Sequence, residues 1–202
     1  YETIIHIMVP ADSDIQSVAD LKGKKIAASQ GVTAQYYLPI VLEAFGMTID
    51  DVSVSELQLA DVVNALNDGT VHAGFHITSY PLATISDLAA TKGIRLLGLP
   101  EEAISSISEK YPYFSRMVIA GGSYQGVNED IVTIGTLNTL ICRADLDEEF
   151  VYNFTKMVCE NSEELGEIHP KASDFNAENT MAGAVIPVHP GAERHYKEIG
   201  IM

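Results

Sequence analysis

Alternation of strand-like and helical patterns over the first hundred residues most constrains the fold of this chain. Between the apolar runs lie segments with apolar residues at helical spacing, such as Leu59, Val62 and Leu66, and glycines close several of them. This order is typical of βαβ units around a mostly parallel sheet, which predicts an α/β fold. The expected strands are Glu2–Pro10, Lys25–Ser29, Val52–Leu57, Val71–Ile77 and Ile94–Leu99.

Helix boundaries follow from capping residues and prolines. Pro39 is expected either to kink a helix that begins at Thr33 or to begin a later one. Thr78 or Ser79 is expected to cap the helix that follows, with Pro81 in its first turn. Ser13 is expected to cap a short helix near the N-terminus. The second half is less regular, and its longest predicted helix runs from 147 to 165.

Composition excludes several classes of function. The 202 residues include 28 acidic and 12 basic side chains, for a net charge of −16. Such a surface repels nucleic acid, so no nucleic-acid partner is expected, whereas a small anion can still bind to local donors. The six histidines show no zinc spacing, and no metal is expected. Cys142 and Cys159 are expected to lie in the core, with a disulfide between them as the alternative.

Two strand-to-helix junctions combine hydroxyl side chains with a helix start. Because the first amides of a helix lack intrahelical partners and carry partial positive charge, each junction can bind an anion at the carboxyl edge of the sheet. Plain helix capping is the alternative, and His76 can equally be a satisfied buried histidine. The candidate residues are Ser29, Gln30, Gly31, Val32 and Thr33 at the first junction and Phe75, His76, Thr78, Ser79 and Tyr80 at the second.

Tyr124 and Gln125 lie in the glycine-flanked segment Gly121–Gly126, where they can line a cleft between two lobes or belong to a packed surface loop. No nucleophile–base pair, carboxylate pair or Gly-x-Ser-x-Gly elbow stands out, and the first junction lacks the Gly-Lys-Ser/Thr of a P-loop. The residues alone therefore assign no catalytic pair.

Several blocks, in order, resemble the TAXI-type solute receptors of TRAP transporters over nearly the whole chain. The most specific are "EKYPYFSRMVIAGGSYQGVNED" and "VHPGAERHYKEIG", whereas "LKGKKI" is shared more widely. The resemblance implies a two-lobed, type II periplasmic-binding-protein-like architecture that closes on its ligand like a hinge. It implies a periplasmic or membrane-anchored extracellular receptor. Such a receptor hands a small anionic solute, a glutamate-like amino acid or a dicarboxylate, to the membrane subunits of a TRAP transporter, without catalysis or cofactor.

The resemblance also implies which residues bind the solute and where the two lobes begin and end. Gly31 to Thr33 match the family's Gly-Ser-Gly-Thr helix start, in a shorter turn that has lost a glycine. Residues 75–80 match its second helix start, and Tyr124 and Gln125 match its Gly-Thr-Tyr-Pro-Gly crossing. The family's N-terminal stretch has no counterpart here, so one lobe is expected to be incomplete. Residues 11–119 would form the intact second lobe, and residues 1–10 and 120–202 part of the first.

An incomplete lobe has a consequence for binding, and two alternative functions stay open. A monomer of this form is expected to bind solute weakly, or to cover its exposed sheet by forming a homo-oligomer. The alternative function is the effector-sensing domain of a transcriptional regulator, which shares the two-lobe plan. The third hypothesis is an enzyme with such lobes. It is the weakest, because no catalytic pair of nucleophile and base can be assigned.

Overall fold

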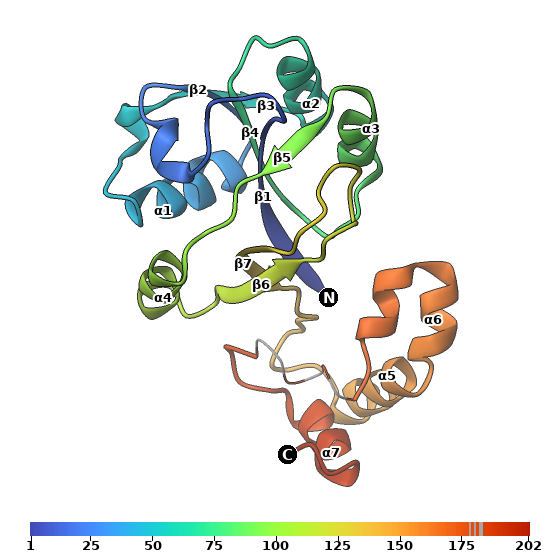
Figure 1. Ribbon diagram of the computed structural model, residues 1–202. Coiled ribbons are helices and arrows are strands. Elements are labelled where there is room, and N and C mark those ends of the chain that lie inside the picture. Colours follow the sequence, from blue (N-terminus) through green and yellow to red (C-terminus); the bar gives the residue numbers. More distant parts are fainter. Residues whose placement is uncertain (178, 180, 182–183) are drawn as a thin grey trace. The chain divides into compact units, whose positions relative to one another are not determined.

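The computed structural model describes residues 1–177, 179, 181 and 184–202 and divides the chain into two compact units (Figure 1). The larger unit is Glu2–Thr136, and the smaller one consists of Tyr1 together with Leu137–Met202.

A mixed sheet forms the centre of the larger unit. Its strand order is β3-β2-β4-β1-β7-β6, with β5 paired to β1. Strand β2 pairs in parallel with β3 and β4, whereas the β1–β4, β1–β5 and β6–β7 pairs are antiparallel. The expectation of a mostly parallel sheet is therefore wrong, because alternation along the chain does not fix which strands become neighbours. The strands are β1 Glu2–Pro10, β2 Lys25–Ser29, β3 Ser53–Leu57, β4 Ala73–Thr78, β5 Ile94–Leu96, β6 Ser115–Ile119 and β7 Ile131–Leu137.

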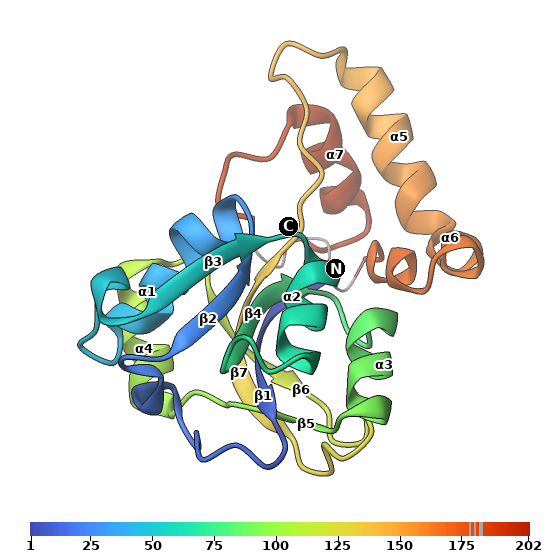
Figure 2. The same cartoon turned by 90° about the horizontal axis from the view of Figure 1, so that it is seen from above.

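Helices cover both faces of this sheet (Figure 2). Odd-numbered residues of β1, such as Ile5 and Ile7, share a core with residues of α1 and α4. The opposite face packs against α2, since a side chain at Gly74 would meet Val62 and Leu66. The helical segments are η1 Val18–Leu21, η2 Thr33–Tyr37, α1 Leu38–Glu43, η3 Ile49–Asp51, α2 Leu59–Asn67, α3 Ala83–Thr91 and α4 Glu101–Lys110.

Local sequence rules succeed around Pro39 and fail at two helix starts. Pro39 lies in the first turn of α1, and the preceding turn, η2, is a π-helix. This agrees with a proline that begins a helix, because its missing N–H cannot bond within the preceding turn. The helix expected at Thr78 or Ser79 begins only at Ala83, after Pro81. Ser13 does not cap η1; Asp20 instead accepts from the Ser17 amide.

The core of the larger unit is continuous and closely packed. Ile5, Ile7, Val41 and Phe75 are each at most 1% exposed. Burying an apolar side chain of this size contributes about 1.5–3 kcal/mol to folding. The strand ends are therefore held by a rigid framework.

The smaller unit is helical. It contains α5 Glu148–Glu160, α6 Ser162–Ile168, η4 Pro170–Asp174 and α7 Pro190–Glu198. The single helix expected over 147–165 is interrupted at Asn161, whose side chain donates to Met157 O and ends α5. Cys142 is exposed and Cys159 half-buried, and the two do not form the alternative disulfide. The core expectation is thus wrong for Cys142, which lies in the exposed segment before α5.

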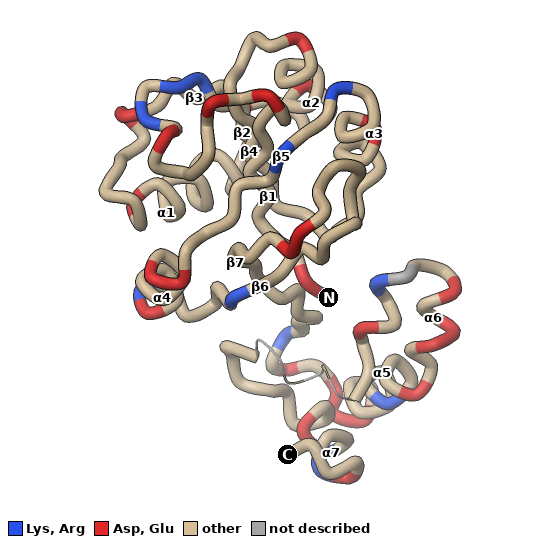
Figure 3. The backbone as a smooth tube through the Cα atoms, in the orientation of Figure 1, with Lys and Arg blue, Asp and Glu red and all other residues tan. Residues whose placement is uncertain are grey.

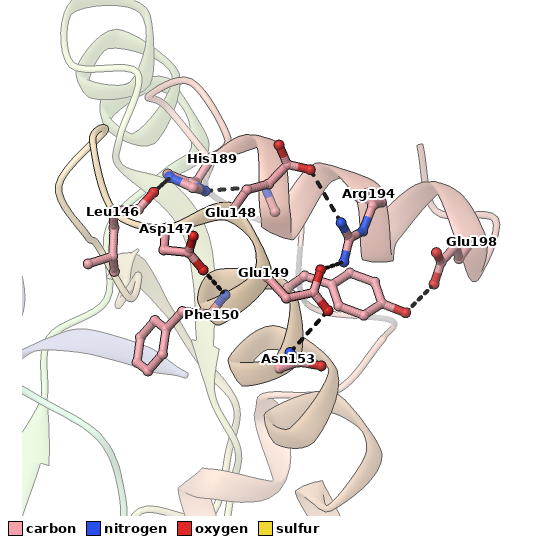
Figure 4. A network of polar contacts seen from close by, with 11 residues as sticks. Leu146, Asp147, Glu148, Glu149, Phe150, Asn153, His189, Arg194 and Glu198 are labelled. Carbon is pink, nitrogen blue, oxygen red and sulfur yellow. Dashed lines mark hydrogen bonds and ion pairs between the residues drawn. The ribbon is translucent and has the colours of Figure 1, made fainter.

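Residues of the block "VHPGAERHYKEIG" form α7 and pack it against α5 (Figure 4). His189 begins α7: its Nδ1 accepts from the Gly191 amide, so its Nε2 carries the hydrogen and donates to Leu146 O. The Arg194 guanidinium lies 3.7 Å from the centre of the Tyr152 ring and donates to Glu149. These contacts fix two helices against each other without using any residue of the two junctions.

We expect Gly191→Ala to separate α5 from α7. A Cβ at this position would lie 2.3 Å from Glu148 O and 2.8 Å from Tyr152 N, both backbone atoms that cannot move alone. Such overpacking costs about 1–3 kcal/mol. Urea unfolding followed by circular dichroism measures the loss, with Lys197→Ala on the exposed face of α7 as the control. Equal stability of Gly191→Ala and the wild type would contradict this packing.

Candidate functional site

The two predicted junctions lie side by side at the carboxyl edge of neighbouring parallel strands. The register of β2 and β4 pairs Ala28 with Phe75, so Ser29 and His76 are the next residues on their strands. Their side chains leave the sheet on the same face. The η2 turn packs against both strands. This edge is where open α/β sheets bind ligands.

The first junction presents backbone amides at the start of a helical segment. Gln30 N donates to Leu57 O, and Gln35 N donates to Gly31 O. The amides between these two residues therefore lie in the first turn, where intrahelical partners are lacking. Gly31 has φ +80°, a conformation that favours glycine. Gln30, Gly31 and Val32 are exposed, whereas Thr33 is buried.

The second junction is more deeply embedded than the first. Phe75 is fully buried in the core, and His76 is half-buried. Thr78, Ser79 and Tyr80 are also half-buried. Because α3 begins at Ala83, Ser79 lies four residues before the helix and does not cap it.

Two buried polar atoms at this edge lack a hydrogen-bond partner among the described residues. They are Ser29 Oγ, on a side chain that is 7% exposed, and His76 Nδ1. A buried polar group without a partner costs about 1–3 kcal/mol, so native proteins retain few of them. Burial lowers the pKa of His76 from 6.5 to about 4, so the ring is neutral at pH 7 and can both donate and accept.

His6 is a buried polar residue of this region that the sequence did not single out. It pairs with His76 across the antiparallel β1–β4 register and is fully buried. Burial, only partly offset by the bond to Ile4 O, lowers the pKa of His6 to about 4. The sequence did contain a signal for this residue, namely a histidine in the middle of an apolar strand. A histidine buried there requires a hydrogen-bond partner.

The partner of His6 is Tyr124, which the structure places differently from Gln125. Tyr124 is 2% exposed, and its hydroxyl lies 3.1 Å from His6 Nε2 and 3.2 Å from Leu82 N. Burial raises the pKa of Tyr124 to about 12, so the hydroxyl keeps its hydrogen. Gln125 is exposed. Thus, within the segment Gly121–Gly126, the Tyr124 side chain is buried and the Gln125 side chain is accessible.

The part of the chain that contains the two junctions carries acidic side chains but no basic ones. Residues 26–91 contain no lysine or arginine but include Glu56 and Asp61. In Figure 3 acidic residues are spread over both units and basic residues are few. Within the described ranges, no cluster of three His, Cys, Asp or Glu side chains could hold a metal ion. In those same ranges every helix is too short or too polar to cross a bilayer.

The chain belongs to the NMT1-like family, whose model matches residues 1–200. A protein described as a binding protein in Brucella abortus (strain 2308) is 37% identical over 65 residues, which are 32% of this chain and 20% of that protein. An equally similar binding protein occurs in Brucella suis biovar 1 (strain 1330).

Solved structures that resemble this chain in fold include a periplasmic binding protein and a cysteine-binding protein. The periplasmic aliphatic sulphonate binding protein SsuA from Escherichia coli matches with a TM-score of 0.50 at 18% identity, over 98% of this chain and 55% of that chain. The cysteine-binding protein from Campylobacter jejuni matches with a TM-score of 0.43 at 16% identity, over 95% and 58%. The chain thus spans little more than half the length of these proteins. The predicted α/β fold of the two-lobed periplasmic-binding-protein type is confirmed.

We expect protonation of buried histidine to destabilise the larger unit in mild acid. Between pH 6.5 and about 4 the unfolded chain binds a proton at His6 that the folded chain excludes. The free energy of unfolding therefore falls as the pH drops through this window, by about 3 kcal/mol for His6. His76 adds to the fall in the same direction.

Urea unfolding midpoints at pH 7, 6, 5 and 4 measure this effect. His6→Gln should flatten the pH dependence, and His169→Gln, at an exposed histidine of the smaller unit, should preserve it. Identical slopes in the wild type and His6→Gln would show that His6 titrates normally.

Proposed function

We propose that this chain belongs to an extracytoplasmic solute-binding receptor that takes up a small carboxylate-containing solute. The observation that carries the proposal is the pair of unpartnered atoms, Ser29 Oγ and His76 Nδ1, beside the exposed first turn at Gly31. A solute that bonds to them would compensate part of their desolvation cost.

The first junction would bind the carboxylate. Amides from Gly31 to Ala34 point out of the start of a helical segment, and a negative charge there gains about 0.3–2 kcal/mol from the local dipole in addition to its hydrogen bonds. The second junction would contribute Thr78, Ser79 and His76. Since residues 26–91 carry no cation, this half of the site would hold the solute by hydrogen bonds and dipoles.

The solute is, we infer, a glutamate-like amino acid or a dicarboxylate. The sulphonate-binding and cysteine-binding proteins named above take small solutes that also carry an acidic group or a carboxylate, which supports this class. No step of the proposal requires catalysis, a cofactor or nucleic acid.

The receptor would act by population shift. A solute that contacts both lobes only in the closed form stabilises that form, which a membrane partner can then recognise. We propose that the partner is the membrane part of a TRAP-type transporter and that the receptor is periplasmic or anchored outside the cell. The resemblance of the C-terminal blocks supports the TRAP assignment, and the periplasmic relatives support the compartment.

We further propose that residues 11–119 form an intact lobe and that residues 1–10 and 120–202 belong to an incomplete one. In support, the smaller unit exposes many large apolar side chains, including Ile141, Phe150, Phe154 and Met157, which are 41–76% exposed. The Phe150 and Phe154 rings stack along one face of α5. An exposed apolar surface of this kind is typical of a site that further polypeptide or a second copy of the chain covers.

We expect Ser29→Ala to weaken solute binding without weakening the fold. A thermal-shift screen with L-glutamate, succinate and L-cysteine would identify a solute, and calorimetry would measure its affinity. Losing one neutral hydrogen bond should lower the affinity about three- to tenfold. The unliganded variant should be at least as stable as the wild type, because it buries one unpartnered hydroxyl fewer.

Ser115→Ala, at an exposed serine of β6, is the matched control and should change neither quantity. If Ser29→Ala and Ser79→Ala both bind the best solute as the wild type does, the solute binds elsewhere.

We expect the 202-residue polypeptide on its own to self-associate through α5. Sedimentation velocity over a micromolar concentration series should show species larger than the monomer. The double variant Phe150→Ser/Phe154→Ser should shift the distribution toward monomer, whereas Ile168→Ser, at an 81% exposed residue off α5, should not. A wild type that stays monomeric throughout the series would refute the homo-oligomer proposal.

A further inference from the structure

We propose that Tyr124 is a positioning residue that holds the second junction in place through the Leu82 amide, with His6 orienting its hydroxyl. This role differs from a direct solute contact, and it rests on contacts within the larger unit rather than on any solute.

The hydrogen positions in this network follow from chemistry. His6 Nδ1 lies 2.9 Å from Ile4 O, and a carbonyl only accepts, so Nδ1 carries the hydrogen. In the neutral ring Nε2 then has a lone pair and accepts from the Tyr124 hydroxyl at 3.1 Å. The Tyr124 oxygen in turn accepts from Leu82 N at 3.2 Å. Each donor has an acceptor, and only one arrangement satisfies them all.

The network joins parts of the chain that are far apart in sequence. His6 lies on β1, Tyr124 in the segment between β6 and β7, and Leu82 immediately before α3. His6 and Tyr124 are both almost fully buried. Their rings pack edge to face, with 5.8 Å between the ring centroids. Because the hydroxyl is excluded from water, loss of its partners cannot be compensated by solvent.

A second tyrosine also connects the residues before α3 with the residues near Tyr124. In this case the tyrosine lies in the second junction, and its partners lie in the other segment. The Tyr80 hydroxyl donates to Val118 O at 3.0 Å and accepts from Ala120 N at 3.4 Å. The junction residues 78–82 are thus tied to residues 118–124 at two points. Ser79 is next to Tyr80 and three residues before Leu82 in the sequence.

The segment that carries Tyr124 is itself fixed by backbone bonds. Gly122 N donates to Val127 O at 2.7 Å, and Val127 N donates to Tyr124 O at 3.1 Å. Gly121 N donates to the Asp130 carboxylate at 2.8 Å. Tyr124 therefore acts from a rigid base, so its hydroxyl determines where Leu82, and with it residues 78–82, can lie.

Amide hydrogen exchange by NMR tests this role directly. In the wild type at pH 7 the Leu82 amide should be protected, although it precedes the helix. In Tyr124→Phe, which conserves volume, it should exchange about tenfold faster or more, while the Gln30 amide, which donates to Leu57 O, should not change. Tyr111→Phe, which loses a hydroxyl bond to Glu43, is the matched control and should leave Leu82 protected.

Two more readouts separate positioning from general stability. The His6 ring should titrate at higher pH in Tyr124→Phe than in the wild type, because its neutral Nε2 loses a donor. Affinity for L-glutamate, if it binds, should fall about three- to tenfold without a change in stoichiometry. Failure of L-glutamate to bind the wild type would count against the proposed solute, while the exchange and titration results still decide the role of Tyr124.

An unprotected Leu82 amide in the wild type, or equal exchange in wild type and Tyr124→Phe, would overturn the proposal. Should Tyr124→Phe not fold, the wild-type comparison of the Leu82 and Ala83 amides still decides it, since only Leu82 has the tyrosine as partner.

Discussion

The parallel pairing of β2 with β4 is the constraint on which the candidate site depends. Because the two strands run in the same direction in the register Ala28 to Phe75, both end at one edge and both send the chain into a turn there. A shift by one residue would turn Ser29 and His76 to opposite faces. The buried apolar side chains of both strands oppose such a shift, so core packing and site geometry have the same cause.

Local patterns predicted the elements of the larger unit and the place of its candidate site. Apolar runs and capping signals located the strands and most helices, and the rule for α/β sheets located the two junctions. What failed was long-range: the antiparallel entry of β1 and the start of α3 at Ala83 depend on segments that meet only in the folded chain. The Leu82 amide shows this, since its partner, Tyr124, is 42 residues away.

Tyr124 illustrates how the same residue supports two interpretations. From the sequence, a tyrosine between glycines suggests an accessible aromatic side chain. In the structure, His6 and Leu82 occupy its hydroxyl, and 118 residues separate His6 from it. No pattern in a single sequence connects positions that distant. The histidine within an apolar strand was nonetheless a signal that some buried partner existed, because an isolated imidazole is costly to bury.

Each unit contains buried polar groups with partners and buried polar atoms that lack one among the described residues, such as His195 Nδ1 and Nε2 in the smaller unit. In the smaller unit Arg194 donates to Glu149 of α5, and Gly191 allows the backbones of α5 and α7 to approach closely, so both residues serve helix packing. In the larger unit His6 and Tyr124 have partners, whereas His76 Nδ1 on the neighbouring strand β4 and Ser29 Oγ on the next strand, β2, have none among the described residues.

Replacing Ser29 by alanine would remove that cost and fit the neighbouring Ala27 and Ala28. We propose that a bound solute compensates for the hydroxyl and the imidazole buried at this edge, since functional sites are where proteins depart from the rules that stabilise the rest of the fold.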